Sequence, residues 1–320
     1  MKNMKKVLPL TLALLLALAV CTGCQKEEVY PDKPIDFLIG FDAGTGADTS
    51  GRLLASLAEE DLGVTINIVN KPGTSGAVSY QEITGYEPDG YTIVQGTLTL
   101  LTHNLLGTIE HSFRDLTPIM TYQTEGSLIY MSKDAPFSSW EEMVSYAKEH
   151  PGKVTMATSS VGGVTNILAQ AVAKELGITF NIIAGTGGGA NAVTQCAGGH
   201  ADLSVGALSE GQSHMDAGNI IPLAVTCQER LEVLPDVPTF GELGIANASV
   251  EQIRAIFAPA GMEEERVKIL QDALMAAAKS DAFLENVKNT GATSTVLDAA
   301  ATAETFAKFE EVIAPVLEGQ

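Results

Sequence analysis

Three glycine-rich segments, each lying between a strand-like run and a helix-like run, constrain the fold of this chain most strongly. They occupy residues 40–46, 158–163 and 185–189. Residues 35–39, before the first segment, form a short apolar run typical of a buried strand, and leucines recur at helical spacing after it. Strands that alternate with helices in this way favour a mostly parallel sheet flanked by helices. We therefore predict an α/β fold.

The alternation of strands and helices occurs twice along the chain. Strands are predicted at residues 35–39, 64–69 and 91–95 and again at 154–157, 178–184, 202–206, 220–226 and 253–258. Helices are predicted from residue 47 and at 76–84, 139–149, 165–176, 190–197, 263–279 and 302–317, and residues 235–238 form a rigid exposed turn. We expect the tail to return to the first unit. The chain then forms two lobes, residues 34–125 plus 252–320 and residues 126–251.

The N-terminus has the features of a secretory signal. Lysines at positions 2, 5 and 6 precede an apolar run at residues 7–20, which is too short for a comfortable membrane span of about 20 residues. Gly23 directly before Cys24 resembles the lipobox of bacterial lipoproteins, although Cys21 stands where Leu is usual. We predict a signal peptide at residues 1–23, lipidation of Cys24 and a polar tether at 24–33. A plain signal peptide with a coincidental cysteine is the alternative.

Net charge excludes several classes of partner. The signal peptide takes three of the 19 basic residues with it, so 16 remain against 39 acidic ones, a net charge of about −23. Such a surface repels nucleic acid, whose binding depends on Lys and Arg neutralising phosphates. It also repels anionic lipid, so acyl chains rather than a basic patch must hold the protein to a membrane. We predict an extracytoplasmic, lipid-anchored protein that binds no nucleic acid.

Little in the sequence points to catalysis. Cys21 leaves with the signal peptide and Cys24 is the predicted lipid site, so only Cys196 and Cys227 remain in the body of the protein. They form either one disulfide or two buried thiols. Neither these cysteines nor the five histidines have metal-ligand spacing, and no Gly-x-Ser-x-Gly segment is present. We predict no metal, no cofactor and no enzymatic activity. A secreted α/β enzyme acting on a small acidic substrate is the alternative function.

The glycine-rich corners are the candidate binding sites. In open α/β sheets ligands bind at the carboxyl ends of strands, and helix N-termini there present free N–H groups that favour anions. Such corners also occur without a ligand, and Asp48 or Thr49 could be a helix N-cap instead. A dinucleotide is disfavoured, because Thr49 replaces the third glycine of that fingerprint and Asn70 replaces its ribose-binding acid.

Several motifs resemble the substrate-binding proteins of tripartite tricarboxylate transporters, also called Bug receptors, and the resemblance runs from Tyr30 to about Leu317. The family opening, Tyr-Pro-x-Lys-Pro-Ile followed by Phe-x-x-Gly-Gly-x-x-Asp-x-x-x-Arg, is similar to residues 30–35 and 41–52. The family segments Asn-Arg-Pro-Gly-x-x-Gly, Pro-Asp-Gly-Tyr-Thr and Leu-Pro-Asp-Val-Pro-Thr are similar to residues 70–76, 88–92 and 234–239.

The resemblance implies a two-lobe periplasmic-binding-protein fold of type II, the Venus-flytrap arrangement, closing on a mono-, di- or tricarboxylate for delivery to membrane permease subunits. The family's ligand residues carry over to Gly44, Thr45, Gly46, Ala47, Asp48, Ser159, Gly162, Val164, Thr165 and Asn166. The third glycine-rich corner adds Gly185 and Thr186 as candidates. The family's Gly-Ser-x-x-His and Tyr-Lys-Gly are absent from residues 162–166 and 184–186. We therefore expect fewer side-chain cations and more backbone contact in this pocket.

Overall fold

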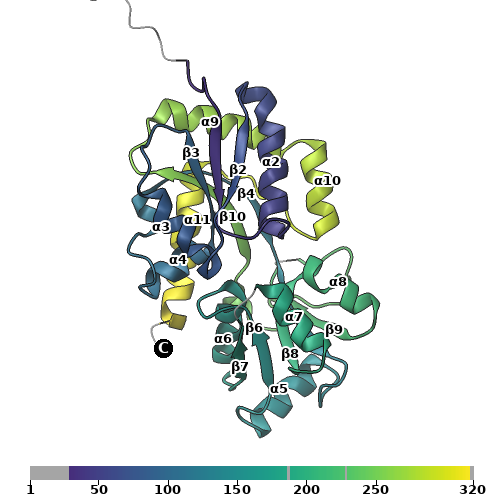
Figure 1. The fold of residues 1–320 in the computed structure, drawn as a ribbon. Helices are drawn as coiled ribbons and strands as arrows, with labels where there is room; N and C mark the ends of the chain where they lie inside the picture. The colour runs from purple at the N-terminus through teal and green to yellow at the C-terminus, as the bar shows by residue number, and fades with distance from the viewer. Residues whose placement is uncertain (1–28, 186–187, 228, 318–320) are drawn as a thin grey trace, which may run out of the picture.

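The computed structural model describes residues 29–185, 188–227 and 229–317. Two five-stranded sheets of the same topology form the centres of two lobes (Figure 1). The first sheet has the order β2 (Ile66–Asn70), β1 (Ile35–Ile39), β3 (Thr92–Thr97), β10 (Gln252–Pro259), β4 (Leu116–Glu125). The second has the order β7 (Asn181–Ala184), β6 (Thr155–Thr158), β8 (Leu203–Ala207), β5 (Ser127–Ser132), β9 (Ile220–Val225). The predicted two-lobe α/β fold is confirmed.

Each sheet is mostly parallel, with one reversed strand. The first three strands of each order pair in parallel, and the fourth, β10 or β5, runs antiparallel to both neighbours. Both reversed strands begin just after the chain passes from one sheet to the other. The first passage lies between Glu125 and Ser127, where β5 begins, and the second lies before Gln252, where β10 begins. Gly126 lies at the first passage, where an added Cβ would collide with the sulfur of Cys227, so only glycine fits.

Helices cover both sheets. The first lobe carries α2 (Gly46–Leu62), α3 (Ala77–Ile83), α4 (Leu98–Leu105), α9 (Glu264–Ala278), α10 (Asp281–Thr290) and α11 (Ala299–Leu317), with 3₁₀ turns η1 (Thr74–Gly76) and η2 (Phe113–Asp115). The second carries α5 (Trp140–Glu149), α6 (Val164–Leu176), α7 (Gly189–Ala197), α8 (Leu208–Asp216) and the 3₁₀ turn η3 (Ala246–Ala248). Within the described ranges, no helix has the length and apolar character that a membrane span requires.

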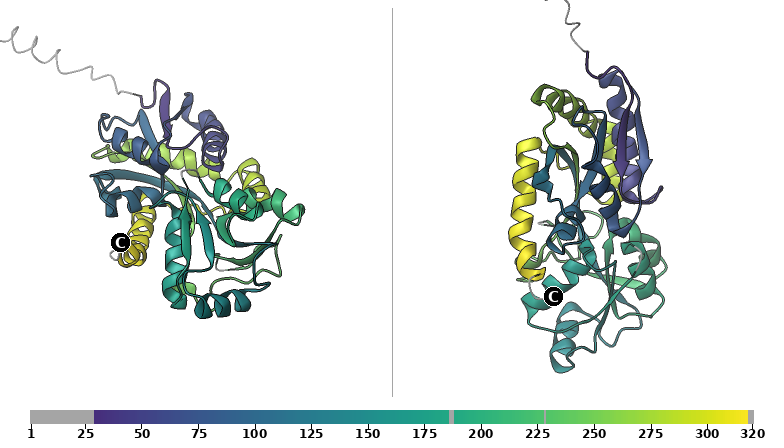
Figure 2. Two further views of the ribbon diagram at one scale, coloured as in Figure 1. Left: turned by 60° about the horizontal axis from the view of Figure 1, so that its bottom comes forward. Right: turned by 60° about the vertical axis from the view of Figure 1, so that its left-hand side comes forward.

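The C-terminal helix joins the two lobes. Helix α11 packs on β4 of the first sheet and extends to α6 of the second lobe, as the yellow helix at the edge of Figure 2 shows. Phe306 on α11 is fully buried and packs edge-on against Phe257, with ring centroids 5.1 Å apart. At the other end, Lys174 Nζ donates to the carbonyl oxygen of Pro315 at 3.0 Å. The tail thus holds the lobes together on the side of the molecule where it lies.

The structure adds elements that the sequence pattern did not predict and corrects others. Strands β4 and β5 and helices α4, α8 and α10 were not predicted. Strand β7 begins at Asn181, three residues later than expected. The turn at 235–238 is not wholly exposed, because Val237 is buried against apolar residues of the second lobe. Cys196 and Cys227 are both free thiols, and Cys196 is fully buried.

Candidate ligand-binding cleft

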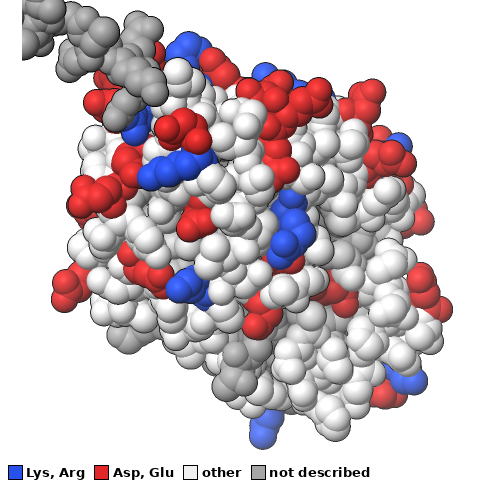
Figure 3. Space-filling view, turned by 45° about the horizontal axis from the view of Figure 1, so that its top comes forward, with Lys and Arg blue, Asp and Glu red and all other residues white. Residues whose placement is uncertain are grey.

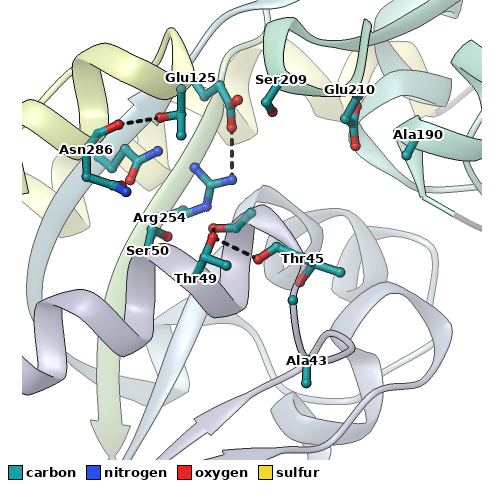
Figure 4. Close-up of a pocket in the computed structure, with 14 residues that line it drawn as sticks. Ala43, Thr45, Thr49, Ser50, Glu125, Ala190, Ser209, Glu210, Arg254 and Asn286 are labelled. Carbon is teal, nitrogen blue, oxygen red and sulfur yellow. Dashed lines mark hydrogen bonds and ion pairs between the residues drawn. The ribbon is translucent and has the colours of Figure 1, made fainter. Parts of the chain in front are cut away.

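Two adjoining cavities, of about 610 and 170 Å³, lie between residues of the two lobes; we call them the larger and the smaller compartment. Their linings include the carboxyl ends of β3 and β8 and the helices that follow, which is where α/β sheets bind ligands. The residues that line both compartments are Thr45, Gly46, Glu125, Ser209, Glu210 and Arg254. The larger compartment is shown in Figure 4.

The first corner is held in shape by Asp48, which lies behind it. Its carboxylate accepts the backbone N–H of Gly44 at 3.0 Å, Asn70 Nδ2 at 2.9 Å and Arg52 Nη2 at 2.7 Å. Burial alone would raise the pKa of Asp48, but these bonds outweigh it and hold the pKa below its usual value. Asp48 lines neither compartment. Asp48 therefore stabilises the loop, and the residues beside it line the cleft.

The N-cap of α2 is Thr45, so the alternatives Asp48 and Thr49 were both wrong. The Thr45 hydroxyl accepts the backbone N–H of Asp48 at 3.4 Å, because Asp48 is already the third residue of the helix. The N–H groups of a first helical turn have no partner within the helix. Gly46 and Ala47 belong to that turn and line the smaller compartment. Their amides are therefore placed to receive an anion.

The second corner brings another helix N-terminus, this one without a side-chain cap, to the same compartment. Helix α6 begins after Gly163 with no side-chain cap, and Val164 and Thr165 line the smaller compartment with Ser159. The Thr165 hydroxyl donates to Ser159 Oγ at 2.8 Å and accepts the Ser159 N–H at 2.7 Å, which fixes the loop. The first turns of α2 and α6 thus reach one compartment from opposite lobes.

Two predicted residues of the second corner have structural contacts instead. The Gly162 carbonyl accepts a hydrogen bond from Thr102 Oγ1 of the first lobe at 2.6 Å. A Cβ at Gly162, whose φ is +77°, would lie 2.5 Å from a methyl carbon of Leu106. Asn166 donates to Thr158 Oγ1 at 3.1 Å inside its own lobe. Neither Gly162 nor Asn166 lines the two compartments.

The third corner already contains a carboxylate of the protein. Glu210 accepts the N–H of Ala207 at 2.8 Å and also that of Ala190, at the starts of α8 and α7. An added Cβ at Gly189 would coincide with this carboxylate, so the glycine makes room for Glu210. The pKa of Glu210 is raised above its usual value, chiefly by burial and also by the charge of Glu125, although the backbone hydrogen bonds from Ala207 and Ala190 oppose the rise. The position that an anion would take at α7 is filled.

Of the two residues predicted at the third corner, only Gly185 belongs to the described residues. Gly185 donates its N–H to the Thr158 carbonyl at 3.0 Å, at the edge of the second sheet, and lines neither compartment. Gly188 and Gly189 line the smaller compartment in its place. Thr186 lies outside the described residues.

Hydroxyl groups of the first lobe form a wall that the sequence pattern did not predict. Thr97, the N-cap of α4, and Thr99 line the smaller compartment, and their hydroxyls are 2.8 Å apart. Both also bond the buried Tyr80 hydroxyl, at 2.9 and 3.1 Å. Ser75 Oγ lies 2.8 Å from Ser160 Oγ of the other lobe, which joins the lobes beside the cleft. Thr97, at the end of a buried strand and directly before a helix, was the available signal for this corner.

A buried ion pair lies where the compartments meet. Arg254 Nη2 is 2.9 Å from Glu125 Oε2, and the two side chains are only 8% and 4% exposed (Figure 4). The expectation of few side-chain cations therefore missed Arg254, which projects from β10 into the cleft. Its charge is balanced by Glu125, so attraction for an anion still depends on helix N-termini. Among the described residues, no cluster of three metal-ligating side chains occurs.

The acidic surface does not dominate the interior of the cleft. The face in Figure 3 carries more acidic than basic side chains, spread over the surface rather than gathered in one patch. At physiological salt such exposed charges are screened over about 8–10 Å. Amides in a first helical turn act at hydrogen-bond distance. The local field at the amide corners is therefore set by backbone groups.

Comparison with known protein families matches residues 51–314 to the family described as tripartite tricarboxylate transporter family receptor. Two relatives come from Bordetella pertussis. A protein of the group named UPF0065 is 27% identical over 278 residues, which cover 86% of each chain. Protein BugT is 24% identical over 298 residues, which cover 92% of this chain and 91% of that one.

Two solved structures share the fold. An R. palustris protein solved with adipate is 24% identical and superposes with a TM-score of 0.79, over 90% of this chain and 98% of that one. MatC from Rhodopseudomonas palustris, solved with bound malate, is 22% identical with a TM-score of 0.76, over 89% of this chain and 100% of that one.

Proposed function

The chain belongs to the tripartite tricarboxylate transporter receptor family, and on that premise we propose that it captures a small organic anion, a carboxylate, between its lobes and delivers it to the permease subunits of a transporter. Membership makes the protein an extracytoplasmic solute receptor rather than an enzyme. The adipate and malate held by the two solved relatives support a carboxylate ligand for this chain as well.

One observation carries the proposal: free first-turn amides from both lobes line one compartment. Gly46 and Ala47 reach it from the first lobe, and Val164 and Thr165 reach it from the second. A carboxylate held by both pairs bridges the lobes and stabilises their closed arrangement. We propose that the lobes, residues 34–125 plus 252–320 and 126–251, move about the two passages between the sheets when the ligand leaves.

Ligand-dependent stabilisation tests this function. A ligand that binds only the folded protein raises its stability by about 2.7 kcal/mol at 100-fold excess over Kd. In a thermal-shift screen of mono-, di- and tricarboxylates, aromatic acids and amino acids, we expect at least one carboxylate to raise the melting temperature clearly. Neutral sugars serve as the control. A shift with sugars alone, and silence from every carboxylate, would contradict the proposal.

Membrane attachment is the second part of the proposal. Residues 1–28, which include Cys24, lie outside the described residues, so this part is supported by the sequence alone. We propose that lipidation of Cys24 and the tether at residues 24–33 keep the receptor on the outer side of the cell membrane, near the permease.

Replacing the proposed lipid site is expected to free the receptor. Cys24→Ser removes the thiol that carries the lipid, and the acidic body offers no basic patch to hold it to anionic lipid. We expect the variant in the soluble fraction after cell fractionation, with Cys21→Ser, which keeps Cys24, as the matched control. A Cys24→Ser protein that stays with the membrane and is cut at the same place would contradict lipidation there.

A further inference from the structure

The two ends of the cleft differ in the balance of hydrogen-bond donors and acceptors that they present. The smaller compartment has the free amides of α2 and α6, which donate. Glu125 and Glu210, where the two compartments meet, and the amide oxygen of Gln123 in the larger one accept hydrogen bonds. A solute that places its carboxylate on the amides therefore extends its other end toward acceptors.

Acidic side chains outnumber basic ones at that end among the described residues. Arg254 is the one basic residue among the described residues that line the larger compartment, and it is paired with Glu125 at 2.9 Å. Glu210 accepts backbone N–H groups from Ala207 and Ala190 and has no ion pair with any described residue. A second carboxylate on the solute would therefore lie near Glu210, and the one described basic side chain beside it, Arg254, already balances Glu125.

The helix N-termini at that end are also unavailable to an anion. The Glu210 carboxylate occupies the starts of both α7 and α8, and Gly189 leaves the space that it fills. Helix N-termini attract anions through their free N–H groups. Those of α7 and α8 bind a carboxylate of the protein itself, so they offer nothing to a ligand anion.

Two buried polar side-chain atoms at this end have no hydrogen-bond partner among the described residues. Gln123 is only 3% exposed, yet its side-chain oxygen has no hydrogen-bond partner. Arg254 is 7% exposed, and its Nη1 has none either. A buried polar group left unpaired costs about 1–3 kcal/mol. A donor group on a solute satisfies Gln123, whereas Arg254 Nη1 is itself a donor and needs an acceptor. Because Arg254 also lines the smaller compartment, the carboxylate of the same solute can supply that acceptor.

We propose that the solute is zwitterionic: a carboxylate that meets the amides of α2 and α6, and an ammonium group at the other end that meets Glu210 and Gln123. The carboxylate end rests on the function proposed above, whereas the ammonium end follows from the acceptors of the larger compartment. The cleft accordingly disfavours a dicarboxylate of the same length, whose second charge meets Glu210.

Calorimetric titration of three matched probe series tests the inference. The series are ω-amino acids, dicarboxylates and monocarboxylates of equal chain lengths. At the best length, we expect the amino acid to bind at least about tenfold more tightly than the monocarboxylate, and the dicarboxylate more weakly than both; tenfold corresponds to about 1.4 kcal/mol.

A charge-neutralising variant assigns the preference to Glu210. Glu210→Gln keeps an oxygen for the Ala207 N–H but removes the charge, so the amino-acid preference should fall about tenfold and the dicarboxylate should gain affinity. Glu311→Gln, at an exposed position on α11, removes the same charge elsewhere and should leave the ranking unchanged. Circular dichroism checks that both variants fold.

The outcomes separate this inference from the function on which it rests. Tighter binding of dicarboxylates than of amino acids, or a ranking that Glu210→Gln leaves unchanged, overturns the ammonium end while the carboxylate receptor stands. Silence from all three series contradicts the carboxylate end, and the zwitterion falls with it.

Discussion

Gly46→Val is expected to weaken carboxylate binding by roughly 100-fold, about 2.8 kcal/mol at 1.4 kcal/mol per factor of ten. An added Cβ at Gly46 would already lie 3.2 Å from Arg254 Nη2, and the two further methyl groups of valine extend into the space around it. They would cover the Gly46 and Ala47 amides, which line the smaller compartment. Titration calorimetry with the best carboxylate from the thermal-shift screen measures the loss.

A glycine outside the cleft provides the control for this substitution. Gly85 is exposed, and the nearest atom to an added Cβ is the Glu82 carbonyl oxygen at 3.5 Å, an ordinary contact. Gly85→Val should therefore bind as the parent protein does. If Gly46→Val kept full affinity, with its fold intact by circular dichroism, the first corner would not be the anion site.

Arg254→Met is expected to lower the free energy of unfolding by about 3–5 kcal/mol, because removing one partner of a buried ion pair leaves the other charge uncompensated. Glu125 is only 3% exposed, and Arg254 is its partner at 2.9 Å. The double variant Glu125→Gln with Arg254→Met removes both charges and should recover most of the loss. Chemical denaturation of the single and double variants measures both values.

An exposed pair with the same separation is the matched control. Arg230 Nε lies 2.9 Å from Glu242 Oε2, but the side chains are 42% and 47% exposed. Exposed pairs contribute about 0–1 kcal/mol, because water screens the charges in both the folded and the unfolded chain. Arg230→Met should therefore lower the free energy of unfolding far less than Arg254→Met does. Equal losses in Arg230→Met and Arg254→Met would show that burial does not decide the strength of the Arg254 pair.

The fold class and two of the binding corners could be predicted from sequence because they depend on local patterns. The apolar run at residues 35–39 and the helical spacing after it report a strand and a helix directly. A glycine-rich turn between them places amides at the carboxyl end of that strand. The same reasoning placed the second corner before α6, and both corners line the smaller compartment.

The charge arrangement of the cleft was decided only by the tertiary structure. Arg254 and Glu125 are 129 residues apart in sequence and meet because β10 pairs with β4. Glu210 follows β8, yet it caps α7 as well as its own helix, so a corner that looked free in the sequence is occupied. Periodicity and turn chemistry describe neighbours along the chain. Strand order and lobe packing decide which distant side chains meet in a low-dielectric space and neutralise one another there. Neither leaves a local pattern in the sequence.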